Sequence, residues 1–320
     1  MVKNYSAYFT IFLLVFSSFL YGQQKKLWLP LTGAKISNSQ IQGKIKLEKY
    51  KAFDLRINEM KQELLKAPGK EVRLKDSSLK MYFPDEKGNL ISFLVKEAPV
   101  MHPDLARKYP DNRSYIGVAE KDPLKRIRFS LNQIGLHAIV AKGSDIQFIE
   151  PLGKDKQSYR VYNRASLDVD DPFNCFTSSL SEELKTGALY KDINDGKLRT
   201  YRLALAATGE YSQFHIILQG ANGGTDAQKK AVVLASMTTA LTRINAVYEN
   251  DLAIRLELVG NNDELIFLDP DTDGYTNDDG LAMLDENQSK CDNVIGNANY
   301  DIGHVFSTDG GGVASLGSVC

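Results

Sequence analysis

The period of the hydrophobic pattern changes once along this chain, and the change divides the chain into two parts. In residues 27–165, apolar and polar residues alternate over many short segments. Strict alternation is the pattern of half-buried β-strands. From residue 198 onward, strand-like segments alternate with helical ones. The sequence therefore predicts a mixed α+β or α/β fold class, in which a β-rich domain precedes a sheet flanked by helices.

The first part is expected to form a mostly antiparallel β domain. Segments 78–83 and 90–95 flank a turn at 84–88, which is a hairpin pattern. Further strands are expected at 126–131, 135–140, 146–150 and 159–162. One helix is predicted from Ala52 to Lys66, where apolar residues recur at helical spacing before Pro68 and Gly69, namely Phe53, Ile57, Met60, Leu64 and Leu65.

Residues 166–197 are polar, acidic and irregular, and they predict a linker that holds a maturation site. The last part, 198–320, then predicts a β-α-β order. Strands are expected at 200–206, 254–259 and 300–306. A long helix is capped by the segment Gly223–Asp226, and a second helix is capped by Asp278 or Asp279. The apolar stripe of the long helix comprises Val233, Met237, Ala240, Leu241, Ile244, Val247 and Tyr248.

The N-terminus has the pattern of a secretory signal peptide over residues 1–22. Lys3 precedes an apolar run from Tyr8 to Leu20, and Gly22 supplies the small residue that follows. The run is shorter than the about 20 apolar residues that a bilayer requires, and no second long run follows it. We therefore expect a secreted protein with no transmembrane segment after signal cleavage, with an uncleaved anchor as the alternative.

Bulk charge and the known catalytic motifs exclude several functions. The net charge is −1, so electrostatics gives no reason to expect a nucleic-acid partner. The four histidines have no HExxH spacing, and no P-loop or G-x-S-x-G motif is present. Residues 269–274 have the acidic spacing of a calcium loop, but Gly280 stands where such a loop needs a bidentate Glu. We interpret this segment as a turn, with a calcium-dependent adhesion module as the alternative.

Residues 198–320 resemble the front of a reprolysin-like (adamalysin/ADAM, M12B-type) zinc metalloprotease domain, a metzincin. The segments that carry this resemblance are Tyr201–Tyr211, Arg243–Tyr248, Leu252–Gly260, Asn299–Thr308, Gly311–Ala314 and Gly317–Cys320. Residues 23–165 are similar, less specifically, to the matching propeptide, through Phe93–Pro99, Pro103–Pro110 and Gly135–Ala138.

The resemblance implies a secreted zinc-dependent metalloendopeptidase precursor that acts on peptide or protein substrates. The family's zinc motif, HExxHxxGxxH, would follow Cys320, so no catalytic residue and no zinc ligand is assigned within these 320 residues. We expect the chain to stop inside a folded domain and to be inactive as it stands. The alternative is a stand-alone propeptide-like module that binds or inhibits a partner protease.

The resemblance also places several residues. Gly312, Val313 and Ala314 match the edge strand that would pair with the substrate backbone. Asp301 matches a structural calcium position, but its partner Glu is replaced by Arg202, so calcium is doubtful.

The chain has three cysteines, Cys175, Cys291 and Cys320. Cys175, in the linker, is a candidate cysteine switch, or else an incidental free thiol. The resemblance pairs Cys320 with a cysteine beyond the zinc helix, and a Cys291–Cys320 disulfide is the alternative within this chain.

Overall fold

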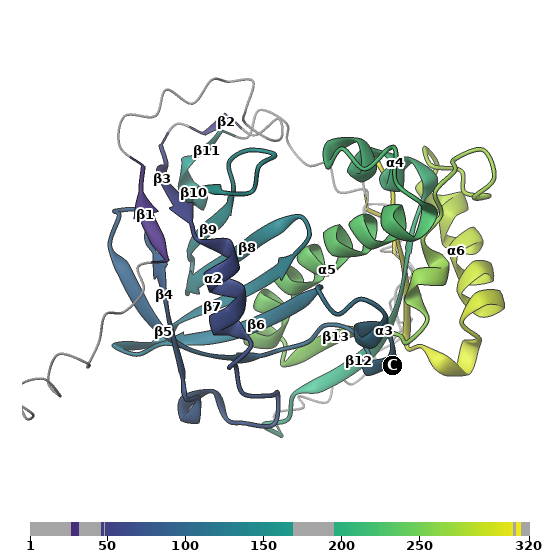
Figure 1. Cartoon of the computed structure of the whole chain (residues 1–320). Coiled ribbons are helices and arrows are strands. Elements are labelled where there is room, and N and C mark those ends of the chain that lie inside the picture. Colours follow the sequence, from purple (N-terminus) through teal and green to yellow (C-terminus); the bar gives the residue numbers. More distant parts are fainter. Residues whose placement is uncertain (1–26, 32–45, 48, 169–194, 310–311, 315–320) are drawn as a thin grey trace, which may run out of the picture.

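The computed structural model describes residues 27–31, 46–47, 49–168, 195–309 and 312–314 (Figure 1). The predicted signal peptide at 1–22 lies outside the described residues, as does most of the predicted linker. We call described residues 27–168 the β-rich region and described residues 195–314 the parallel-sheet region. Together they give the mixed helix-and-sheet architecture that the sequence predicts.

A nine-stranded antiparallel sheet forms most of the β-rich region, in the order β1-β3-β10-β9-β8-β7-β6-β5-β4. Consecutive strands from β4 to β10 are neighbours, as in a meander, so short turns suffice to connect most of them. The strands are β1 (Trp28–Pro30), β3 (Lys51–Leu55), β4 (Leu79–Pro84), β5 (Leu90–Glu97), β6 (Arg113–Ala119), β7 (Asp122–Asn132), β8 (Gly135–Lys142), β9 (Asp145–Pro151) and β10 (Ser158–Asn163).

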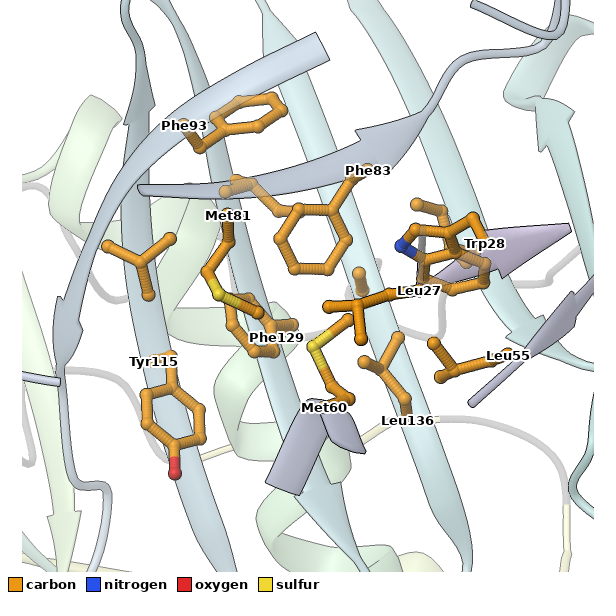
Figure 2. Packing of buried hydrophobic residues seen from close by; sticks show 14 of the residues in the cluster. Leu27, Trp28, Leu55, Met60, Met81, Phe83, Phe93, Tyr115, Phe129 and Leu136 are labelled. Atoms are coloured by element: carbon orange, nitrogen blue, oxygen red, sulfur yellow. The ribbon is translucent and has the colours of Figure 1, made fainter. Parts of the chain in front are cut away.

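An aromatic core holds this sheet in a curved shape. Trp28 of β1 packs against Phe83 of β4, with ring centroids 6.1 Å apart, and its Nε1 donates a 2.8 Å hydrogen bond to the carbonyl oxygen of Tyr82. These contacts join the first and last strands of the sheet order across the core. Phe129 lies beneath Phe83 and stacks on Tyr115, with centroids 4.9 and 5.0 Å away (Figure 2).

The helix predicted from Ala52 to Lys66 is wrong in its first part. Residues Lys51–Leu55 form β3, and the helix α2 spans Ile57–Leu64. Phe53 and Leu55 do face the core, but they do so by strand alternation, because β3 is paired on both sides by β1 and β10. Met60 and Leu64 then bury the inner face of α2, while Leu65 is 60% exposed.

Several elements of the β-rich region were not predicted from the sequence, among them β1, β2, β6 and α3. Strand β6 completes the sheet between β5 and β7, and a short helix, α3 (Pro103–Lys108), follows β5. The predicted linker also begins with a paired strand, because β11 (Leu167–Asp168) is antiparallel to β2 (Lys46–Leu47).

The parallel-sheet region contains three parallel strands in the order β13-β12-β14. They are β12 (Arg199–Ala207), β13 (Ile254–Leu258) and β14 (Ile302–Phe306). Helices α4 (Gly209–Leu218) and α5 (Asp226–Asp251) connect β12 to β13, and α6 (Gly280–Val294) precedes β14. The predicted β-α-β order is confirmed.

The predicted caps of both long helices are confirmed. Thr225 forms a capping box with Gln228 at the start of α5, and Asp279 accepts hydrogen bonds from two backbone N–H groups at the start of α6. The apolar stripe of α5 is buried as far as Leu241, but Val247 and Tyr248 are exposed. Helix α5 is long and apolar enough to span a membrane by composition alone, yet most of that stretch is buried, as in the core helix of a soluble domain.

Helix α4 was not predicted from the sequence, which gave a strand at 200–206 and no element between it and the long helix. The strand ends at Ala207, and Thr208 caps α4 by accepting a hydrogen bond from the N–H of Tyr211. Gly209 is required at the first turn, since a Cβ there would collide with the backbone of Asp269 and Pro270.

Two apolar clusters cover the two faces of the parallel sheet. One lies between the sheet and α5 and includes Leu205, Met237 and Leu241. The other lies beneath α6 and includes Ala204 and Cys291. The first cluster also contains residues from the β-rich region, namely Val100, Met101 and Leu105. The two regions therefore share a core.

Candidate functional site

Strand β14 and the segment that follows it form the candidate site. In the part of the chain that the structure describes, β14 pairs only with β12, in parallel register from Leu203↔Ile302 to Ala207↔Phe306. A strand paired on one side presents its other row of backbone N–H and C=O groups for additional pairing. This edge lies opposite β13 in the sheet order.

A row of aromatic rings covers the α4 side of β14. Tyr211 and His215 of α4 lie with ring centroids 4.4 Å apart, and Tyr211 lies 5.3 Å from Phe306 of β14. His304 contacts Phe306 from the next position on the same face, at 5.6 Å. Phe214 extends the row beyond His215 and is 54% exposed. We call these five side chains the aromatic row.

The aromatic row is an apolar surface that contains two imidazoles, those of His215 and His304. Burial lowers the pKa of His215 to about 4, so this ring is neutral at neutral pH. His304 and Phe214 are exposed, and Ile217, also on α4, is 59% exposed. Within the described residues, this surface therefore combines large apolar groups with access to solvent.

Asn277 joins the ends of β12 and β14 beside the aromatic row. Its Oδ1 accepts a 3.1 Å hydrogen bond from Thr208 Oγ1, and its Nδ2 donates to Thr308 Oγ1 at 3.1 Å. The backbone N–H of Thr208 donates to the carbonyl oxygen of Phe306 at 3.0 Å. These bonds fix the point at which the chain leaves the sheet.

The structure places Gly312, Val313 and Ala314 in an irregular conformation that has no strand pairing. The Val313 side chain lies at the start of α6, where a Cβ on Gly280 would approach its Cγ2 within 3.0 Å. The predicted substrate-binding role of these three residues remains a prediction.

Arg202 donates hydrogen bonds to both carboxylate oxygens of Asp301, the residue that the resemblance matches to a structural calcium position. The guanidinium donates to Asp301 Oδ1 at 2.7 Å through Nη2, and the backbone N–H of Arg202 donates to Oδ2 at 2.7 Å. The hydrogen bond from Arg202 holds the pKa of Asp301 below its usual range. A cationic side chain therefore stands where a calcium ion would need free carboxylate oxygens.

The segment Asp269–Gly274 is a turn in which the carboxylates of Asp269 and Asp273 accept hydrogen bonds from nearby backbone N–H groups. Asp269 accepts from the N–H of Asp271 and from Thr272 Oγ1. Asp273, which is 2% exposed, accepts from the N–H of Gly209 at 2.6 Å and from that of Tyr275 at 2.8 Å. Asp273 therefore links this turn to the start of α4.

Of the three cysteines, only Cys291 lies among the residues that the structure describes. Cys291 is a buried free thiol on α6, and burial raises its pKa to about 11, so it is protonated at neutral pH. Cys175 and Cys320 lie outside the described residues, so the proposed switch and both disulfide alternatives remain predictions.

The four histidines do not converge on one site. His102 caps α3, His137 lies 3.4 Å from Arg243, and His215 and His304 belong to the aromatic row. No group of three His, Cys, Asp or Glu side chains able to hold a metal ion occurs in the described ranges. The described residues therefore supply no ligand set for a catalytic zinc ion.

Sequence reasoning did not find the aromatic row. The run Tyr211–Ile217 contains four apolar side chains, but their spacing marks no single face, so it gave no clear helical signal. His215 and His304 lie far apart in sequence and on different elements, which leaves no spacing to recognise.

Comparison with known families finds a match over about a quarter of the chain. Residues 234–320 match the model of metallopeptidase family M12B, reprolysin-like. This part of the chain is similar to reprolysin-like peptidases. The match runs from within α5 through β13, α6 and β14 to Cys320, and over these residues it confirms the reprolysin-like resemblance drawn from the sequence. A search of curated proteins found no match.

The reprolysin-like match indicates which properties the proteins similar to this chain have. The M12B family consists of zinc-dependent peptidases that act on peptides or proteins, and its members are typically secreted or extracellular. Zinc is therefore expected for the family, although the described residues supply no set of ligands for it.

Proposed function

We propose that this chain is the front part of the precursor of a secreted zinc-dependent metalloendopeptidase. The observation that supports this most strongly is the family match over residues 234–320. This range holds most of α5 and all of β13, α6 and β14, while the central strand β12 of the same sheet precedes it. The β-rich region would be the propeptide.

Under this proposal, the zinc ligands come from a helix encoded after Cys320. These 320 residues contain no HExxH motif, and the described residues contain no three-ligand cluster. The aromatic row is the apolar surface available for such a helix, because Tyr211, His215 and Phe306 are only partly covered by α4 and β14 themselves. The described chain therefore contributes a scaffold and no catalytic residue.

The substrate would bind along the β14 side of the sheet. An extended peptide can pair with exposed backbone groups, so backbone hydrogen bonds would supply affinity and the neighbouring side chains would select the peptide. Gly312–Ala314 would provide that pairing once the segment is ordered as a strand. Cys175 is proposed as the thiol that keeps the precursor silent, because it precedes the parallel-sheet region in the chain.

The test compares this 320-residue chain with a version extended by the codons that follow Cys320 in its gene. Zinc content is measured by mass spectrometry of the purified proteins, and hydrolysis is measured on a fluorescent casein substrate. We expect stoichiometric zinc and hydrolysis only in the extended protein after its propeptide is removed. The same extended protein with the Glu of its HExxH motif changed to Gln should keep zinc and lose hydrolysis.

Two results would overturn the proposal. One is a stoichiometric tight zinc site in the 320-residue chain. The other is a stop codon directly after Cys320 together with a folded monomer, which would instead support a stand-alone module that binds or inhibits a partner protease.

A further inference from the structure

Two arginines of β7 point away from the aromatic core, toward the C-terminal part of α5. Along β7, Ile127 and Phe129 belong to the core of the β-rich region, so strand alternation places Arg126 and Arg128 on the opposite face. There, Arg126 Nη1 donates a 3.2 Å hydrogen bond to Oδ1 of Asn250 on α5. Both guanidinium groups line a notch between the sheet and the last turns of α5.

The floor of this notch is apolar. Ile116 of β6 and Ile139 of β8 are paired with Arg128 on the neighbouring strands, and Ala141 of β8 is paired with Arg126. Paired residues share one face of an antiparallel sheet, so these three side chains lie beside the two guanidinium groups. The notch has a volume of about 270 Å³, counting the space that is open to solvent, which is less than sites for drug-sized ligands have. It therefore suits a ligand of a few non-hydrogen atoms.

Positive charge exceeds negative charge at the notch. Glu249 is the one carboxylate among the described residues that line it. Glu249 Oε2 lies 2.5 Å from Arg128 Nη1, and Glu249 Oε1 accepts a 2.5 Å hydrogen bond from Arg255 Nε. With Arg126, three guanidinium groups face this one carboxylate, which leaves a formal charge of +2. The unpaired carbonyl groups at the C-terminus of α5 offset only about half a charge of this excess.

Arg128 has donor capacity that its protein neighbours do not use. The residue is 2% exposed, and its Nη2 makes only a long contact, 3.5 Å, with the carbonyl oxygen of Ala98. Its Nε–H has no hydrogen-bond acceptor among the described residues. A buried donor without an acceptor is unfavourable, and nearly all such groups in native proteins are paired. An anion in the notch would supply the acceptor.

We propose that this notch binds a short-chain aliphatic carboxylate of the size of butyrate. Its oxygens accept hydrogen bonds from Arg126 and Arg128, because a planar guanidinium group matches a carboxylate in shape and charge. Its alkyl chain lies on Ile116 and Ile139. The notch contains no residue of the aromatic row or of Gly312–Ala314, so this inference goes beyond the metalloprotease proposal and does not rest on it.

The apolar floor favours a carboxylate over an inorganic oxyanion. Sulfate would accept hydrogen bonds from the guanidinium groups, but its whole surface is polar, so it would gain nothing from the isoleucine side chains. An alkyl chain gains affinity by leaving water, and each buried methylene group lowers the Kd by about fourfold. Affinity should therefore rise from acetate through propionate to butyrate.

The test is a nuclear magnetic resonance titration of the full 320-residue chain with isotopically labelled arginine. Sodium butyrate replaces sodium chloride at constant ionic strength, and the arginine Nε–H signals are followed. We expect a saturable shift of an arginine signal, with a Kd that falls about fourfold for each methylene group from acetate to butyrate. The absence of a saturable shift, or sulfate binding as tightly as butyrate, would overturn the proposal.

Matched variants test where the carboxylate binds. Arg126 is exposed, so Arg126→Gln should fold normally, and we expect it to bind butyrate about tenfold more weakly because a charge-assisted hydrogen bond is lost. Arg126→Lys keeps the charge without the planar fork, and its Kd should fall between the two. Arg164→Gln removes the same charge at an exposed arginine outside the notch and should bind as the unsubstituted protein does. Equal weakening in Arg126→Gln and Arg164→Gln would show an effect of net charge alone and would refute the assigned site.

Discussion

The two regions of this molecule build their cores in different ways. The β-rich region encloses its own aromatic cluster, in which Trp28, Phe83 and Phe129 come from strands of a single curved sheet (Figure 2). The parallel-sheet region is covered on one face by α6, and on the other it completes its core with Val100 and Leu105 from the β-rich region. Among the described residues, the core of the β-rich region is self-contained, because all its side chains come from that region. The core of the parallel-sheet region is borrowed in part, because it includes side chains from the β-rich region.

This difference follows from strand topology. An antiparallel meander can curl, so that its first and last strands meet over a common core, and here Trp28 closes that gap with its hydrogen bond to Tyr82. A parallel sheet of three strands has two faces to bury and two edges to pair. In this chain α5 and α6 cover the two faces, and the arm at residues 100–102 pairs with the edge of β13.

The largest effect is expected from breaking the self-contained core. Phe129→Ala removes a fully buried ring that contacts Phe83 and Tyr115 and should lower the free energy of unfolding by about 4 kcal/mol. Urea unfolding followed by tryptophan fluorescence measures this directly, because Trp28 is the only tryptophan and lies in the same cluster. Leu124→Ala, at a side chain that is 74% exposed on the same strand, is the control and should change stability little. Similar midpoints for the two variants would contradict the assigned core.

A smaller effect, but on the other region, is expected from Leu105→Ala. This residue belongs to the β-rich region by sequence and to the α5 core by packing, so its truncation should cost about 3 kcal/mol. Far-UV circular dichroism reports mainly on the helices of the parallel-sheet region, and we expect its transition to shift at least as far as that of Trp28 fluorescence. If only the fluorescence transition moved, Leu105 would not belong to the core of the parallel-sheet region, and the two regions would unfold independently.

The sequence predicted the strands and the two long helices of the parallel-sheet region, with α4 missed, whereas it predicted the β-rich region only in part. Alternation gave β4, β5 and β7 to β10, because each half-buried strand carries its own period. Strand β6 was missed since Gly117 interrupts its pattern, although the structure needs glycine there: a Cβ would lie 2.8 Å from Ile127 Cγ2. Strand β3 was assigned to a helix because Phe53, Ile57, Met60 and Leu64 also fit a helical period.

The contacts between the regions could not be predicted from local pattern. Thr238, Thr239 and Thr242 have the composition of a solvated helix face, and their burial is visible only when Ser114 and Ser130 are placed opposite them. Those partners lie more than a hundred residues away in sequence. The resemblance to reprolysin-like proteases predicted the order of strands and helices in the parallel-sheet region, but the arm that pairs with Leu258 was not among its predictions.

The smallest expected effect tests the interface through pH. His137 lies beside Arg243 and Glu150, with Arg160 on the other side of that carboxylate. Burial, and next the charge of Arg243, lower the pKa of His137 to about 4 from an ordinary value of 6.5. Burial opposes ionisation of Glu150, but Arg243 and Arg160 outweigh it and hold the pKa of Glu150 below its usual range.

The sign of the pH effect follows from these directions. Between pH 6.5 and about 4, the unfolded chain binds a proton at His137 that the folded protein does not, so stability falls as pH falls through this window. We expect His137 to account for a loss of about 2 kcal/mol across the window. Glu150 acts in the same direction at lower pH, where its paired carboxylate must be protonated.

His137→Gln should flatten this pH dependence while His215→Gln tests the other region. Burial also lowers the pKa of His215, on α4, to about 4, so the two histidines should contribute separately. Chemical unfolding at several pH values between 4 and 7 gives the slope for each variant, and slopes rather than absolute stabilities are compared. If His137→Gln kept the slope of the unsubstituted protein and His215→Gln alone reduced it, the acid-sensitive contact would lie in the aromatic row, and the interface between the regions would hold unchanged as the pH falls.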